Sequence, residues 1–135
     1  MSRTYYENMT SHLKEFFYVI TGSFIGSSLR YFIYRYGNLS FLNHGLSSTL
    51  FVNALGSFVF GLCLTQIKSS APFGLFLAVG IIGSFTTFST FSFESVTLLL
   101  EGKIGYFAFN ILMNLSLSFL SFYIGFLINQ KYFSF

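Results

Sequence analysis

The residues best suited to chemistry lie between Gly80 and Glu94, within a long apolar segment. Hydroxyl and phenyl side chains alternate there, and one carboxylate closes the stretch. The hydroxyls and rings of this stretch are those of Ser84, Phe85, Thr86, Thr87, Phe88, Ser89, Thr90, Phe91, Ser92 and Phe93. Hydroxyls donate hydrogen bonds to anions, and the edge of a phenyl ring is electropositive. Such groups, without a full positive charge, suit a small, strongly hydrated anion that must both enter and leave.

Three asparagines, Asn53, Asn110 and Asn114, add amide donors to other apolar segments. Each belongs to a stripe of polar and small residues at helical spacing. The stripes are Thr49, Asn53, Ser57 and Gly61, and then Asn110, Asn114, Ser118, Ser121 and Gly125. An amide inside hydrocarbon is costly unless it is hydrogen-bonded, so Asn53 is expected to face other helices or water.

Purely structural roles would also explain why these residue types occur here. The chain has 21 phenylalanines, so any spacing between two of them is common. Ser and Thr in membrane helices often bond to carbonyls of their own helix, and Asn53 can simply join two helices. Permeation of a small solute and plain helix packing therefore both remain open on these grounds.

The elements that position these residues are membrane helices. The chain has 135 residues, of which 53% are hydrophobic and only 8% are charged, against roughly 25% in ordinary soluble domains. We predict one all-α membrane domain over residues 1–135, with spans at about 16–34, 46–66, 72–100 and 105–128. Turns are expected at Gly37–Gly45, Lys68–Pro72 and Glu101–Lys103. No nucleophile–base pair or metal-ligand spacing supports an enzyme, and the lone Cys63 is interpreted as a small apolar residue.

The third segment is too long for a straight span. Pro72–Leu100 would be about 43 Å long as one helix, against roughly 30 Å of hydrocarbon. Gly80 and Gly83, followed by Ser84 and the pair Thr86–Thr87, are the expected site of a break. Unwound backbone at membrane depth is tolerated where it is buried in protein or lines a watery cavity, and its carbonyls then serve as ligands.

In the first segment, Gly22, Gly26 and Arg30 share one helix face. The two glycines are typical of a close-packing seam. Arg30 either extends to the headgroups from the end of the span or faces the bundle at a pore entrance.

Basic residues are divided almost evenly between the two sides of a four-span arrangement. One side holds Arg3, Lys14, Lys68 and Lys131, and the other holds Arg30, Arg35 and Lys103. The orientation of a protein in the membrane follows the difference in basic residues between its two sides, and a difference of one residue favours neither orientation strongly. The count is compatible with insertion in both orientations, and pairing of opposite copies would give an antiparallel dimer.

Three motifs resemble those of the Fluc/CrcB fluoride channels. Gly80–Glu94 (GIIGSFTTFSTFSFE) resembles the signature of their third span, and Thr49–Phe58 (TLFVNALGSF) that of their second. Gly22–Tyr31 (GSFIGSSLRY) is similar to the pattern of the first span, with Ser27 where alanine is usual.

The resemblance implies a dual-topology dimer in the bacterial inner membrane with two fluoride pores, which exports fluoride and lowers its toxicity. It implies that Phe88 and Phe91 are the pore rings, that Asn53 is the pore asparagine, and that Glu94 lies along the fluoride path. Further implied pore residues are Thr90, Ser92, Asn110 and Asn114. Arg30 would lie at the vestibule.

The resemblance also implies a central sodium ion, Na⁺, held by backbone carbonyls of Gly83 and Thr87. The fourth span matches less well: aligned on Gly125, Asn110 stands where tyrosine is frequent and Asn114 where serine is frequent. The partner is either an identical copy or a paralogue of opposite orientation.

The alternative function is that of a small multidrug-type proton-coupled transporter, another class with four spans and dual topology. That class uses a carboxylate in its first span, where this chain has none.

Overall fold

The computed structural model describes residues 2–37, 46–69 and 71–133, and all regular structure in these ranges is helical. The elements are α1 (Ser2–Tyr36), α2 (Leu46–Leu62), α3 (Leu64–Ser69), α4 (Ala71–Gly74), the π-helix η1 (Leu75–Ile82), α5 (Gly83–Phe85), α6 (Phe88–Leu100) and α7 (Ile104–Phe133). Residues 38–45 of the first predicted turn and Ser70 of the second lie outside the described residues.

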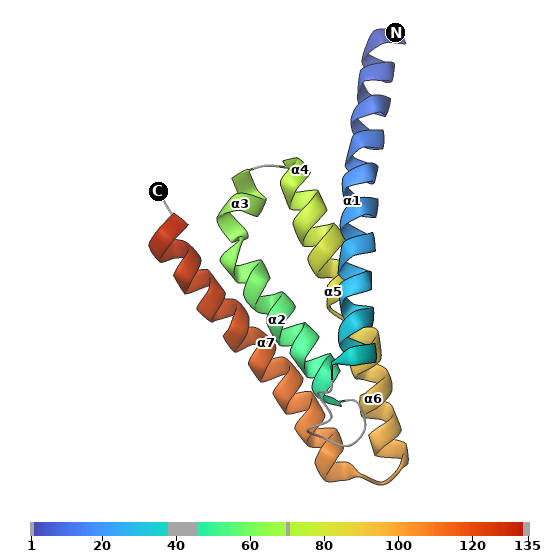
Figure 1. Ribbon diagram of the computed structural model, residues 1–135, viewed down its shortest axis with the longest axis vertical. Coiled ribbons are helices and arrows are strands. Elements are labelled where there is room, and N and C mark those ends of the chain that lie inside the picture. Colours follow the sequence, from blue (N-terminus) through green and yellow to red (C-terminus); the bar gives the residue numbers. More distant parts are fainter. Residues whose placement is uncertain (1, 38–45, 70, 134–135) are drawn as a thin grey trace.

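Helix α1 is a single helix of 35 residues, whereas the sequence predicted a span only at 16–34. The preceding residues contain no glycine or proline, so nothing stops the helix from continuing toward Ser2. In Figure 1 this N-terminal part projects beyond the ends of the other helices.

The second predicted span, 46–66, is divided. Helix α2 ends at Leu62 and α3 begins at Leu64, with a turn at Cys63 between them. Backbone bonds nevertheless continue through the turn, from Cys63 N to the Val59 carbonyl at 3.0 Å and from Ile67 N to the Cys63 carbonyl at 2.9 Å. Asn129 of α7 donates to the Leu62 carbonyl at 2.6 Å and so supports the end of α2.

The third segment is interrupted, but at a narrower place than the sequence predicted. Only Thr86 (φ −75°, ψ 158°) and Thr87 (φ −149°, ψ 105°) are extended. Gly83 is helical at φ −61°, ψ −31°, and Gly80 lies inside η1, so the expectation of unwound backbone at these two glycines was wrong. The Thr87 side chain then starts α6 by accepting a bond from Thr90 N at 3.1 Å.

Glycines in the first and third segments instead allow close packing. A Cβ on Gly22 would lie 2.3 Å from the Phe76 carbonyl oxygen, and one on Gly26 would lie 2.1 Å from that of Ile81. A Cβ on Gly80 would lie 2.8 Å from the Cα of Gly22. The predicted glycine seam of α1 is therefore confirmed, and its partner is η1.

Helices α2 and α7 cross closely in the same way and lie side by side in Figure 1. A Cβ on Gly61 would lie 2.2 Å from the Phe122 carbonyl oxygen, and one on Gly125 would lie 2.3 Å from that of Phe58. Small residues in both polar stripes thus bring the backbones together and hold the stripes face to face.

The predicted turn at Glu101–Lys103 joins α6 to α7. Gly102 has φ 72°, Gly102 N donates to the Leu99 carbonyl, and Lys103 N donates to the Leu98 carbonyl. This pattern is a Schellman motif, which needs a left-handed residue at its glycine.

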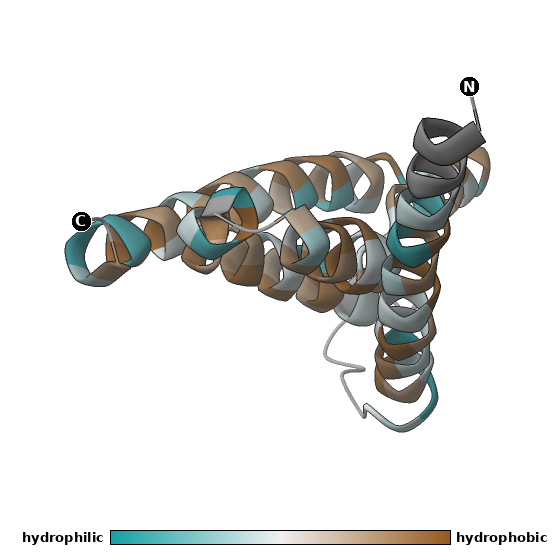
Figure 2. Ribbon diagram, turned by 90° about the horizontal axis from the view of Figure 1, so that it is seen from above, coloured by the Kyte–Doolittle hydropathy of each residue, from teal (hydrophilic) through white to brown (hydrophobic). Residues whose placement is uncertain are grey.

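Three helical segments among the described residues are long and apolar enough to cross a membrane: Thr10–Tyr36, Ala71–Leu100 and Ile104–Phe133. The apolar helix Ser48–Leu62 is shorter. Viewed from above, hydrophobic residues dominate these helices, and hydrophilic residues stand out at the C-terminal end of α7 (Figure 2). The chain is thus an all-α, multi-pass membrane protein.

Candidate functional site

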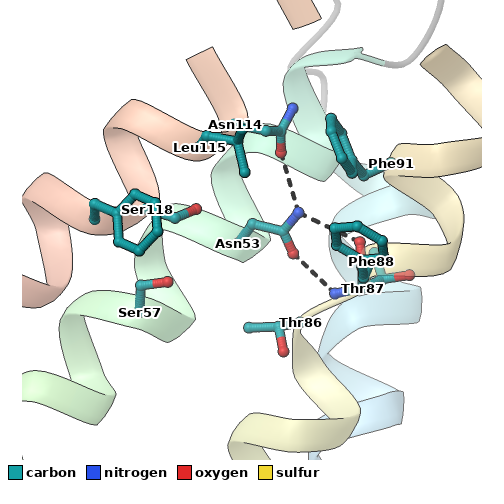
Figure 3. A pocket seen from close by; sticks show the side chains of 10 residues that line it. Asn53, Ser57, Thr86, Thr87, Phe88, Phe91, Asn114, Leu115 and Ser118 are labelled. Carbon is teal, nitrogen blue, oxygen red and sulfur yellow. Dashed lines mark hydrogen bonds between the residues drawn. The ribbon is translucent and has the colours of Figure 1, made fainter. Parts of the chain in front are cut away.

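A cavity of about 250 Å³ lies beside the interruption of the third segment. Its walls come from α2, α6, α7 and the two extended residues Thr86 and Thr87 (Figure 3). The lining residues are Asn53, Ser57, Thr86, Thr87, Phe88, Phe91, Asn114, Leu115, Ser118 and Phe119. Every charged side chain that the structure describes lies outside this lining, so the cavity offers only hydroxyls, amides, backbone groups and rings.

Asn53 occupies the centre of this site. Its Oδ1 accepts the Thr87 N–H at 2.8 Å, and its Nδ2 donates to the Thr87 carbonyl at 3.3 Å and to Asn114 Oδ1 at 3.0 Å. One amide therefore satisfies both backbone groups of an extended residue that lies outside any helix. The expectation that Asn53 faces other helices is confirmed, and it joins helices while also lining the cavity.

The amides continue as a chain of hydrogen bonds that all run in one direction. Asn114 Nδ2 donates to Asn110 Oδ1 at 2.7 Å, and Asn110 Nδ2 donates to Ser95 Oγ at 3.0 Å. Ser95 Oγ then donates to the Phe91 carbonyl at 2.8 Å. Asn110 and Asn114 are 2% and 4% exposed, so the predicted polar stripe of α7 faces the bundle. Asn110 is reached through Asn114 and lies outside the cavity lining.

Phe88 and Phe91 are neighbours on one face of α6, as their spacing predicted. Their ring centroids are 5.3 Å apart with an interplanar angle of 58°. Phe91 is buried, whereas Phe88 is 73% exposed at the mouth of the cavity. The two rings lie beside Asn53 in the wall of the cavity (Figure 3).

Several hydroxyls of α6 already have partners within the helix. Ser92 Oγ donates to the Phe88 carbonyl at 2.9 Å, and Thr97 Oγ1 donates to the Phe93 carbonyl at 2.9 Å. Thr87 Oγ1 lies 2.8 Å from Thr90 Oγ1. Ser92 and Ser95 therefore donate to carbonyls of their own helix, which is the purely structural role considered for such residues.

Two hydroxyls of the cavity differ in this respect. Ser57 of α2 and Ser118 of α7 are shown in Figure 3, and neither makes a hydrogen bond to any part of the chain that the structure describes. These hydroxyls can donate to a bound ion or solute without first breaking a hydrogen bond within the protein.

Arg30 faces the bundle, and its Nη1 donates to the Thr86 carbonyl at 3.3 Å. It lines a second cavity of about 360 Å³, together with Ser27, Tyr31, Tyr34 and Thr90. Of the two expectations for Arg30, the orientation toward the bundle is the one observed. Its guanidinium and the Asn53 amide thus contact neighbouring residues, Thr86 and Thr87.

Glu94 lines neither cavity. Its Oε1 accepts a hydrogen bond from Thr49 Oγ1 at 2.5 Å, and Thr49 in turn lies 2.6 Å from the Tyr34 hydroxyl. Its Oε2 is buried without a partner in the described structure. Tyr34 was predicted only as the end of the first span, and its partner Thr49 lies on another helix.

The interruption also frees a backbone carbonyl. In a continuous helix the Thr87 N–H would donate to the Gly83 carbonyl, but here it donates to Asn53. The Thr87 carbonyl has the Asn53 amide as a neighbour at 3.3 Å and retains a second lone pair. Gly83 and Thr87 thus present backbone oxygens close to the break.

Comparison with known proteins finds a matching family. A family model described as CrcB-like protein, Camphor Resistance (CrcB), matches residues 17–126. The matched range includes Arg30, Asn53, the interrupted third segment, Asn110 and Asn114.

Individual relatives cover most of the chain as well. The chain is 44% identical over 116 residues to the "Fluoride-specific ion channel FluC" of Elusimicrobium minutum, covering 84% of this chain and 92% of the relative. It is 42% identical over 111 residues to the protein of that name from Campylobacter jejuni strain RM1221, covering 79% and 90%. It is 42% identical over 121 residues to a protein of that name from Thermus thermophilus, covering 84% and 94%.

Proposed function

The chain belongs to the CrcB family, and we propose that it is a fluoride-specific ion channel that lets fluoride leave the cytoplasm. The function is that of a channel and not of an enzyme. The multidrug-type transporter has no support among the relatives, which carry the fluoride-channel name.

The proposal rests chiefly on the position of Asn53 between the extended Thr87 and the rings of Phe88 and Phe91. This arrangement puts amide, hydroxyl and ring-edge donors around one cavity without a charged group. Several weak donors lower the cost of removing water from fluoride, and each releases the ion again.

The donors differ in how readily they reach the ion. Ser57 and Ser118 are available at once, whereas both amide hydrogens of Asn53 already have acceptors. Fluoride therefore displaces a protein acceptor when it binds Asn53, and that acceptor reclaims the hydrogen when the ion moves on. Because such an exchange replaces one hydrogen bond with another, the ion is held only briefly.

The pore we propose runs along α6. Phe88 and Phe91 form its aromatic part, and Asn114 and Asn110 extend its donors along α7. Thr90 and Ser92 contribute hydroxyls that must first leave their present partners. Arg30 attracts anions to the vestibule, which is the second cavity.

We propose four membrane crossings, with α2 and α3 together forming the second. These helices and the turn between them would extend for about 36 Å at 1.5 Å per residue, enough to cross the hydrocarbon. The crossings are α1, then α2 with α3, then α4 through α6, and finally α7.

The functional unit we propose is an antiparallel dimer in the bacterial inner membrane. Phe88 is 73% exposed beside the polar groups of Asn53 and Thr87, and polar groups are costly against lipid. A second copy of opposite orientation would cover this face and complete the pore. The near-even division of basic residues is compatible with an identical copy, and a paralogue of fixed orientation is the other candidate.

A sodium ion at the centre of the dimer is part of the proposal. Backbone carbonyls of unwound helices are suitable ligands for sodium, and the Gly83 carbonyl has lost its helical donor. Gly83 and Thr87 would hold the ion, which would fix the two interrupted segments against each other. A non-exchanging density ringed by these carbonyls in an experimental dimer structure supports this assignment, and a dimer without it removes the sodium claim.

The direct test of function uses purified protein in liposomes loaded with potassium fluoride. A fluoride electrode is expected to record rapid efflux once a potassium ionophore balances the charge. Vesicles with the protein that release fluoride no faster than empty vesicles would refute the channel assignment.

A further inference from the structure

A chain of three hydroxyl and carboxyl groups connects the Arg30 cavity to Glu94. The Tyr34 hydroxyl of α1 lies 2.6 Å from Thr49 Oγ1 of α2, and Thr49 Oγ1 donates to Glu94 Oε1 of α6 at 2.5 Å. Thr49 is fully buried at 0% exposure, so water does not compete for its hydroxyl. Three helices are thus joined by two short hydrogen bonds in series.

The direction of this chain follows from the number of hydrogens. A threonine hydroxyl has one hydrogen, and that of Thr49 goes to Glu94. The contact between Tyr34 and Thr49 therefore needs the hydrogen of Tyr34. While these bonds exist, the tyrosine donates to Thr49 and Glu94 is held in place by Thr49.

Tyr34 also borders the space that an anion near Arg30 would occupy. It lines the cavity of about 360 Å³ together with Arg30 and Thr90. The Ser27 hydroxyl of this cavity donates to the Ser23 carbonyl at 2.7 Å, and Thr90 Oγ1 is bonded to Thr87 Oγ1. An anion in this cavity would lie between side chains that include the Arg30 guanidinium and the Tyr34 hydroxyl, because both residues line it.

We propose that Tyr34 is a positioning residue that couples anion entry to the release of Glu94. When an anion accepts the hydrogen of Tyr34, two oxygen atoms 2.6 Å apart would be left without a hydrogen between them. Thr49 then turns its hydroxyl toward the phenolic oxygen, and Glu94 Oε1 loses its donor. Each hydrogen stays on its own oxygen, and only the direction of donation reverses.

This inference rests on the proposed fluoride channel and adds an order of events to it. Glu94 is held while the Arg30 cavity is empty and is free to turn once an anion has entered. Because Oε2 has no partner in the described structure, the bond from Thr49 is the one that fixes the carboxylate.

Four variants and one control test the coupling by fluoride efflux from liposomes. Tyr34→Phe removes the hydrogen that the anion would take, and we expect fluoride efflux to fall about fivefold, the order of effect of one neutral hydrogen bond. Tyr36→Phe removes the hydroxyl of an exposed residue on the same helix, outside both cavities, and is expected to leave efflux unchanged. Thr49→Ser keeps the hydroxyl and is expected to retain wild-type efflux.

The variant that carries both Tyr34→Phe and Thr49→Val separates an effect of hydrogen-bond coupling from an effect of altered packing. Without the Thr49 hydroxyl, the hydrogen-bond chain from Tyr34 to Glu94 is broken, so Tyr34→Phe should have no further effect on efflux in a Thr49→Val background. A fivefold effect in both backgrounds would overturn the proposal, and so would equal efflux in Tyr34→Phe and wild-type protein. Wild-type protein that does not pass fluoride would instead refute the proposed function itself.

Infrared difference spectroscopy gives a second readout, which does not depend on the folding of the Thr49→Val variant. Sodium fluoride should shift a carboxylate band in wild-type protein that is missing in Glu94→Gln. The shift should be absent in Tyr34→Phe and present in Tyr36→Phe. The same shift in Tyr34→Phe would show that Glu94 responds to the anion without Tyr34.

Discussion

Asn53 and Thr87 form two reciprocal hydrogen bonds at the interruption of the third segment. The Thr87 N–H donates to Asn53 Oδ1 at 2.8 Å, and Asn53 Nδ2 donates to the Thr87 carbonyl at 3.3 Å. A side-chain amide carries a donor and an acceptor on one planar group, so asparagine replaces the helical partners that Thr87 lacks. The residue that we propose binds the anion thus also stabilises the break.

Asn53→Asp is predicted to abolish fluoride efflux. The carboxylate keeps an acceptor for the Thr87 N–H but has no hydrogen for fluoride, and its charge repels the anion and faces the Thr87 carbonyl. Efflux from liposomes measures the loss, and size-exclusion chromatography checks that the variant elutes like the wild-type protein. Gln130→Glu makes the same amide-to-acid change at an exposed position of α7 and should leave efflux intact. Unchanged efflux in Asn53→Asp would remove Asn53 from the pore.

Phe88→Ile is likewise predicted to abolish fluoride efflux while the protein still dimerises. Isoleucine keeps the apolar bulk but lacks the electropositive ring edge that the cavity offers an anion. Phe93→Ile is the matched control, because Phe93 is 71% exposed on the same helix, close to the 73% of Phe88, and lies outside the cavity lining. Equal efflux from the two variants would contradict a pore role for the Phe88 ring.

Gly26→Ala is predicted to destabilise the packing of α1 on η1. The added Cβ would lie 2.1 Å from the Ile81 carbonyl oxygen, and backbone on both sides must shift to make room. Overpacking of this kind costs about 1–3 kcal/mol or more. Thermal unfolding in detergent measures the change, with Gly105→Ala as control because nothing lies within 4 Å of its Cβ. A Gly26→Ala protein as stable as Gly105→Ala would show that the seam is loose.

Asn129→Ala is predicted to lower stability without acting on the pore. Asn129 is 2% exposed, donates to the Leu62 carbonyl at 2.6 Å and accepts from Thr65 Oγ1 at 2.5 Å. Loss of these partners leaves buried polar groups unpaired, at a cost of about 1–3 kcal/mol. Thermal unfolding is the measurement, and Gln130→Ala is the exposed neighbour for comparison. Equal stability of the two variants would show that the end of α2 does not depend on Asn129.

The sequence was most informative about residues at helical spacing. The stripe containing Asn53 and the stripe containing Asn114 meet at one cavity, and Phe88 and Phe91 share its wall, because the period of a helix decides which residues lie on one face. The length of the third segment also predicted an interruption correctly. Both inferences depend on local geometry alone.

Contacts between segments could not be predicted in this way. Gly80 and Gly83 were expected to unwind, but Gly80 is needed for the close approach of Gly22, which the sequence of one segment does not show. Asn129 was missed because the fourth span was predicted to end at Ile128, although Asn129 follows Gly125 at the spacing of the stripe. Tyr34 was missed because its partner, Thr49, lies on another helix.

The most direct test of the central claim is a paired efflux measurement in which identical liposomes contain either fluoride or chloride. We predict rapid release of fluoride and release of chloride no faster than from empty vesicles, because the cavity offers small donors and ring edges without a charged group. Equal rates for the two ions, or no release of fluoride, would contradict it.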